Sequence, residues 1–200
     1  MKRARRFSNV ALVCLVATGS VMPTLQAAEI VAYGFETGLE GWMIPDWAKN
    51  SPDYVATAIQ PSSEHAEEGA ASLKFDVAFP GGRWTGAYVE RLAEVTDWTS
   101  FSRLSVSVYL PAEAPTGLKG RCILSVGESW QWTEMSHATS LIPGQWTTIS
   151  ANLKPGSMDW KFFPDDAFRK DIRKIGIRIE SDKAPVYNGP VFVDNVRLLK

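Results

Sequence analysis

Cysteine is nearly absent from this chain of 200 residues, which contains only Cys14 and Cys122. Cys14 lies in an amino-terminal segment that we expect to be removed, so the remaining thiol would have no partner for an internal disulfide. Cys122 stands on an apolar strand, where a lone cysteine is usually a small buried hydrophobic residue. The sequence therefore predicts a fold held together by its core, which a chain of this length can bury without disulfides.

Long apolar runs are also missing. The run at residues 10–17 is too short to span a bilayer, and glycine, serine and proline interrupt the sequence soon after it. A basic leader at residues 1–6 precedes the run, and small residues follow it at Ala27 and Ala28. This order is typical of a secretory signal peptide. We therefore predict a signal peptide at residues 1–27, one domain at residues 28–200, and a secreted or periplasmic protein.

Positive charge is scarce outside that leader. Removal of its four basic residues would take the formal net charge of the chain from −1 to −5. No basic patch or run of lysines would remain, so nucleic acids and anionic membranes are poor candidate partners. We expect no membrane insertion and a monomeric protein.

Helical periodicity is missing from almost the whole chain. Short segments with alternating apolar residues are instead separated by glycine and proline turns, as residues 104–110 illustrate. Only residues 165–174 look helical, with Asp165 and Asp166 suited to the helix start. The expected strands lie at residues 30–35, 54–59, 72–79, 85–92, 104–110, 121–126, 146–153, 175–180 and 189–199. This pattern, without a repeat or a linker, predicts an all-β antiparallel sandwich or jelly roll with one short helix.

Four short motifs resemble those of β-jelly-roll carbohydrate-binding modules. Residues 34–42 (GFETGLEGW) are similar to the F-E-x-G-x-x-G-W opening of that family, and residues 191–198 (VFVDNVRL) to its closing aromatic-x-D-N-V-x-L strand. Residues 67–74 and 143–148 are similar to its G-x-x-S-L-K and G-x-W segments. The resemblance is to galactose-binding-like modules attached to mannanases and other plant-cell-wall hydrolases. It implies a non-catalytic module for a polysaccharide, such as the β-linked glycans mannan or glucan.

The same resemblance implies a structural calcium ion. In that family the opening glutamate and the closing aspartate share calcium with backbone carbonyls, and Glu36 and Asp194 match these positions. Glu67, with the carbonyl near Ala70, is the candidate for the remaining ligands, since calcium takes several hard oxygen atoms. The alternatives are that Glu36 and Asp194 only accept hydrogen bonds from turn amides, or that no ion is bound.

Tryptophan is abundant, with eight residues, all of which lie after residue 41. A rigid ring packs on the flat C–H face of a sugar, while polar side chains at the rim bond its hydroxyl groups. The alternation of residues 122–126 marks a core-facing parity, which a turn at Gly127 is expected to reverse. We therefore expect Trp130 and Trp132 to form an exposed platform flanked by Glu134. The alternative is that one or both rings plug the end of the sandwich.

Two other strands carry candidate contacts on the face opposite their core residues. Alternation sends Trp84, Tyr88 and Glu90 away from the core on one strand. It does the same for Arg178 and Glu180 on another. Arg178 and Glu180 would form hydrogen bonds with sugar hydroxyl groups. The alternative is a solvated face with a cross-strand ion pair. The predicted carbohydrate-binding residues are Trp130, Trp132, Trp84, Tyr88, Arg178, Glu180 and Glu134.

The other tryptophans have different contexts. Trp42, Trp98 and Trp146 are expected to be packing residues because they lie at structural turns or at the start of a core strand. Trp47 and Trp160 lie in loops, where either one would be able to form part of a binding rim.

The sequence contains no recognisable arrangement of catalytic residues. His65 and His137 are the only histidines, both in loop-like contexts, and no catalytic triad or zinc-type spacing is present. The scattered glutamates do not form the E-x-D-x-x-E strand of jelly-roll glucanases. We therefore predict a protein that is not an enzyme. A hydrolase or lyase on this scaffold is one alternative. A protein-binding adhesion or assembly domain is another, and it would expose an apolar patch with a polar rim.

Overall fold

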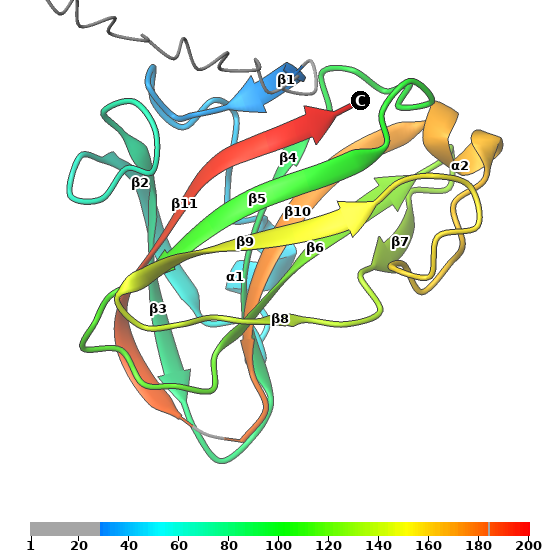
Figure 1. Ribbon diagram of the computed structural model, residues 1–200. Coiled ribbons are helices and arrows are strands. Elements are labelled where there is room, and N and C mark those ends of the chain that lie inside the picture. The colour runs from blue at the N-terminus through cyan, green and yellow to red at the C-terminus, as the bar shows by residue number, and fades with distance from the viewer. Residues whose placement is uncertain (1–28, 184) are drawn as a thin grey trace, which may run out of the picture.

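The computed structural model describes residues 29–183 and 185–200. Within them the chain forms two antiparallel sheets, one of six strands and one of five, which are stacked as two layers (Figure 1). The strands are β1 (Glu29–Tyr33), β2 (Ala56–Ser62), β3 (Ser72–Pro80), β4 (Thr85–Leu92), β5 (Arg103–Leu110), β6 (Lys119–Val126), β7 (Gln131–Glu134), β8 (Thr139–Ser140), β9 (Gln145–Asn152), β10 (Ile172–Ser181) and β11 (Val186–Leu199). The helices are α1 (Asp46–Lys49) and α2 (Asp166–Lys170).

The two sheets differ in their strand order. The first runs β2-β3-β11-β5-β9, with β1 also paired to β11, and the second runs β4-β10-β6-β7, with β8 paired to β6. Neighbouring strands in each sheet are therefore often far apart in the sequence. The second sheet carries the site described below.

The core lies between the sheets and follows from the alternation of the strands. In β5 every second residue from Leu104 to Leu110 is fully buried, and in β10 the isoleucines from Ile175 to Ile179 are equally covered. Successive strand residues point to opposite faces, so these sets meet in one apolar layer. Cys122 belongs to this layer, and burial raises the pKa of its thiol to about 12. The prediction of a buried, unpaired cysteine is confirmed.

The predicted antiparallel sandwich is confirmed, but the predicted helix at residues 165–174 is too long. Asp165 caps α2 as expected, since its side chain accepts a hydrogen bond from the amide of Phe168 at 2.6 Å. The helix ends at Lys170 because Ile172 already belongs to β10, where it pairs with Val126 of β6. Strand pairing across the sheet therefore overrides the local helical pattern.

Three further elements were not predicted. Helix α1 has four residues and strand β8 two, which is too few for a periodic signal, and β7 follows a tight turn. The predicted signal peptide at residues 1–27 lies outside the described residues. In the part of the chain that the structure describes, no helix has the length and apolar character needed to cross a membrane.

Candidate functional site

The outer face of the second sheet, which points away from the core, carries a row of side chains across its strands. The strand register aligns Glu90 of β4 with Gly176 of β10, Ile123 of β6 and Glu134 of β7. Both glutamates therefore lie on this face, three strand spacings apart. At the usual separation of neighbouring strands this is roughly 14 Å.

Gly176 makes room for a ring that forms the floor of the site. A Cβ at this position would lie 2.3 Å from the hydroxyl oxygen of Tyr88, so only glycine lets the tyrosine lie across the strand. Tyr88 is fully buried and donates a hydrogen bond of 3.0 Å to Glu90. Burial, followed by the charge and the hydrogen bond of Glu90, raises the pKa of Tyr88 far above its usual value. The phenol therefore stays protonated and acts as a donor.

One wall of the site comes from the loop that contains α1. Its two ends are fixed to β4, because Met43 and Glu90 exchange backbone hydrogen bonds of 2.9 Å and the amide of Val55 donates to the carbonyl of Gly86 at 2.8 Å. The loop is thus held against the edge strand of the sheet. This anchoring decides where the rings carried by the loop lie.

Two rings of that loop stand over the tyrosine floor. Trp47 of α1 lies with its ring centre 4.9 Å from that of Tyr54 and 5.2 Å from that of Tyr88. Trp132 closes the group, 5.9 Å from Trp47 and 5.3 Å from Tyr88. Trp47 is 43% exposed. The cluster is therefore an aromatic surface that still faces solvent.

The opposite wall comes from the β6–β7 hairpin. The amide of Trp130 donates to the carbonyl of Gly127 at 3.0 Å, and the following pairing sets Trp132 opposite Ser125 on the outer face. The predicted turn at Gly127, which reverses the core-facing parity, is confirmed. Trp130 itself belongs to the turn and not to β7, is 46% exposed, and has the Lys174 ammonium 5.5 Å from its ring centre.

Between these walls lies a cavity of about 500 Å³, which we call the first hollow. It is lined by Trp47, Tyr54, Glu90, Ser125, Trp130, Trp132 and Lys174. Aromatic walls with a few fixed polar groups are typical of sites for small molecules and oligosaccharide-sized ligands.

Glu90 and Lys174 supply a polar pair at the floor of the first hollow. Their carboxylate and ammonium are 2.5 Å apart, and the other Glu90 oxygen accepts from Tyr88. A carboxylate oxygen has two acceptor positions and an ammonium three donors, so each group keeps capacity for a ligand hydroxyl. The hydrogen bonds already present fix the orientation of the carboxylate before any ligand arrives.

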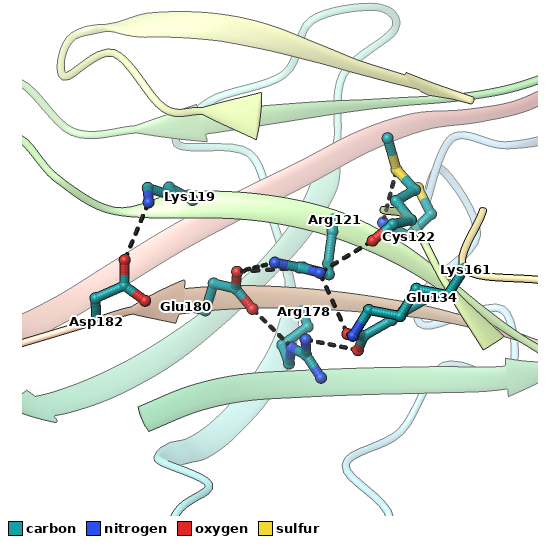
Figure 2. Close-up of polar contacts among 9 residues, drawn as sticks. Lys119, Arg121, Cys122, Glu134, Lys161, Arg178, Glu180 and Asp182 are labelled. Atoms are coloured by element: carbon teal, nitrogen blue, oxygen red, sulfur yellow. Dashed lines mark hydrogen bonds and ion pairs between the residues drawn. The ribbon is translucent and has the colours of Figure 1, made fainter. Parts of the chain in front are cut away.

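Arg178, Glu180 and Glu134 are not exposed, and the expectation of an open charged face was wrong. Each retains 8% or less of its surface. Figure 2 shows them in one network, in which Arg178 lies 2.7 Å from Glu134 and 3.0 Å from Glu180, while Arg121 lies 2.5 Å from Glu180. The cross-strand ion pair, which was the alternative, is present in a buried form. Strand parity gave the correct face but carried no information about what covers it.

The structure brings together part of the predicted set. Trp130 and Trp132 line the first hollow, and Tyr88 lies beneath it. Glu134 lies beside Trp132 in a neighbouring hollow. Trp84 is 36% exposed and packs on Arg178, with the guanidinium 5.3 Å from its ring centre, outside the lining of the first hollow.

Other lining residues were not in the predicted set. Glu90 was correctly placed on the outer face by the alternation that turned Tyr88 outward, but it was not included among the predicted binding residues. Lys174 fell within the overextended helix prediction. Tyr54 began a predicted strand, but β2 starts only at Ala56, so the strand period did not place its side chain. Trp47, one of two candidates for the rim, lines the first hollow.

The remaining aromatic residues lie elsewhere. Trp42, Trp98 and Trp160 are buried at 2% exposure or less, which confirms two of them as packing residues and removes Trp160 from the rim. Trp146 is half-buried on the outer face of the other sheet, with its ring centre 5.5 Å from that of Tyr109.

The carboxylates predicted to hold calcium gather around the loop at residues 65–71. Glu36 accepts from the amide of Ala70 at 3.0 Å, and Asp194 accepts from the amide of Glu67 at 2.9 Å. Burial, with the carboxylates of Glu67 and Glu36 adding to it against two amide donors, raises the pKa of Asp194 to about 6. These bonds match the turn-amide alternative. Among the described residues, no three histidine, cysteine or acidic groups are placed to hold a metal ion.

Comparison with known proteins identifies the family of this chain. Residues 33–195 match the family described as mannanase, galactose-binding domain-like. The chain belongs to this family. The predicted resemblance is thereby confirmed. No curated protein matches the chain in sequence.

Solved structures share the fold of this mannanase galactose-binding-like chain at low identity. The CBM27-1 module of Caldicellulosiruptor saccharolyticus, crystallised with mannohexaose, is 17% identical with a TM-score of 0.59, over 84% of this chain and 95% of that module. A CBM28 module specific for non-crystalline cellulose is 19% identical with a TM-score of 0.62, over 90% and 100%. The mannan-recognising TmCBM27 is 21% identical with a TM-score of 0.51, over 88% and 98%. The chain thus has the fold of carbohydrate-binding modules.

Proposed function

We propose that this chain is a non-catalytic module that binds a β-linked polysaccharide, with mannan as the favoured ligand, in the first hollow. The observation that carries the proposal is an aromatic cavity of about 500 Å³ whose floor is a fixed Glu90–Lys174 pair. Aromatic rings exposed to water on a rigid sheet bind favourably to a ligand whose flat apolar face covers them, because apolar surface is removed from water. Membership in a mannanase-associated family favours mannan over other glycans.

Trp132 is the residue that best tests this proposal, because it lines the first hollow and packs on both Trp47 and Tyr88. We expect Trp132→Ala to weaken retention on mannan by about tenfold or more, since truncating a central aromatic contact typically costs about 2 kcal/mol. Affinity electrophoresis in gels with mannan, xylan, β-glucan or cellulose measures this loss and identifies the preferred polymer.

Trp146→Ala is the matched control, because it removes a partly exposed indole from the other sheet. It is expected to bind mannan like the wild type. Equal retention of both variants would contradict the proposal. Reducing-sugar release from any polymer would instead favour a hydrolase, and a wild type that binds none of the polymers would leave the protein-binding alternative.

We further propose that the protein is exported and binds calcium at the loop of residues 65–71. Export rests on the basic leader and short apolar run of residues 1–27, and the intact mass of the protein from its host tests it. Calcium rests on the family motifs at Glu36 and Asp194, and a melting experiment for it is given below.

A further inference from the structure

A second hollow adjoins the first on the other side of Trp132. It has a volume of about 230 Å³ and is lined by Trp132, Thr133, Glu134, Lys161 and Phe162. Trp132 lines both hollows, so the two adjoin at this ring. Strand β7 lies at the edge of the sheet. A ligand that passes from the first hollow to the second would therefore run across the strands and beyond this edge.

The second hollow repeats the chemistry of the first. The first combines an exposed ring, Trp130, with the Glu90–Lys174 pair, and the second combines Phe162 with a pair between Glu134 and Lys161. The two glutamates lie in the same cross-strand row, roughly 14 Å apart at usual strand spacing. A polymer of identical sugars presents C–H faces and hydroxyl groups repeatedly along its length. Two adjoining hollows of similar chemistry fit such a ligand.

The polar group of the second hollow is fixed in advance. Arg178 holds one oxygen of Glu134 at 2.7 Å, Arg121 holds the other at 3.3 Å, and Lys161 also pairs with it (Figure 2). A carboxylate held in this way does not lose further conformational freedom when it accepts a bond from a ligand.

The apolar group of the second hollow is open to solvent. Phe162 is 51% exposed on the loop that precedes α2, and its neighbour Phe163 is 57% exposed. Only Phe162 lines the second hollow. A ligand that extends past Trp132 would cover its ring.

We infer that the glycan-binding surface extends past Trp132 into the second hollow, where Phe162 and Glu134 take a further sugar residue of the same chain. This inference rests on the proposed function and deepens it. It predicts that affinity still increases with oligosaccharide length after the first hollow is filled.

Isothermal titration calorimetry with linear manno-oligosaccharides, from the disaccharide to the hexasaccharide, tests the inference. Phe162→Ala should weaken binding of the longest oligosaccharides by about three- to tenfold and leave the shortest unchanged, since one aromatic contact is lost. The half-exposed position makes loss of folding unexpected, and the melting temperature of the variant verifies this.

Phe163→Ala is the matched control and should bind every length like the wild type. Equal affinities of wild type and Phe162→Ala at every length would overturn the inference, as would equal losses in both phenylalanine variants. In either case a loss caused by Trp132→Ala would still support the proposed function. A wild type that binds no member of the series would overturn the inference together with mannan as its ligand.

Discussion

Glu134 is a buried carboxylate whose ion pairs contribute to the stability of the fold. Burial by itself would raise the pKa of this carboxyl, but the Lys161 hydrogen bond and the charges of Arg178 and Arg121 outweigh it and hold the pKa below the usual 4.5. Near that pKa the folded protein binds fewer protons than the unfolded chain. Its contribution to stability is therefore complete above about pH 4.5 and is lost as the pH falls through the lowered pKa.

Glu134→Gln should lower the free energy of unfolding by about 2 kcal/mol at pH 7, because Arg121 and Arg178 each lose a charged partner. At pH 3 the difference from the wild type should shrink, since the wild-type carboxyl is then increasingly protonated. Urea unfolding at both pH values measures this. Glu113→Gln, at an exposed position, should leave stability unchanged at either pH. A destabilisation independent of pH would count against the charge argument.

At this scale the sequence predicted orientation well and exposure poorly. Alternation placed Tyr88, Arg178 and Glu180 on the outer face correctly, because the strand period depends only on the local backbone. Tyr88 of β4 packs against Trp47 of α1, and Arg178 of β10 packs against Trp84, so each is covered by a ring from another part of the chain. No local pattern encodes that cover.

Among the elements, the β6–β7 hairpin supplies two of the tryptophans that line the first hollow. Its turn ends at Trp130, which has a φ of 55°, in the left-handed region that a bulky side chain rarely adopts. Such a conformation costs about 1 kcal/mol and is often found where function requires it. The strain sets an exposed indole at the rim of the first hollow.

Trp130→Gly and Trp130→Ala separate the backbone from the ring. Glycine removes the strain, so this variant should be more stable than the alanine variant by about 1 kcal/mol. Both should bind mannan more weakly than the wild type, because both lack the indole. Thermal unfolding and affinity electrophoresis provide the two measurements. Wild-type affinity in either variant would remove Trp130 from the site.

The elements were predictable in proportion to their regularity. The alternation of β5 and β10 is strong enough to be read directly, whereas α1 and β8 are too short for a period. The end of α2 was misplaced because residues 172–174 carry no local signal stronger than their pairing in β10.

At the scale of the whole molecule, β11 ties distant segments together. It pairs with β1, β3 and β5, and its Asp194 binds the loop of residues 65–71. An ion bound between this strand and that loop would join parts of the chain that are 127 residues apart. It would stabilise the sandwich without touching the first hollow on the other sheet.

Calcium added to chelator-treated protein should therefore raise the melting temperature without changing affinity for mannan. The expected gain is about 2.7 kcal/mol at a hundredfold excess over Kd. Differential scanning calorimetry measures it, with Glu36→Gln as the variant that should lose the response. A melting temperature indifferent to chelator and to added calcium would contradict the proposed ion and leave only the turn-amide role.

By itself, the sequence determined the two-sheet class, the faces of the strands and the turn that sets Trp132 on the outer face, since strand period and turn chemistry act over a few residues. The tertiary structure decided which rings meet. Trp47, Tyr88 and Trp132 come from three separate segments, and their rings meet only because β4, β10, β6 and β7 lie side by side. That order is set by packing of the whole core, which no short stretch of the chain specifies.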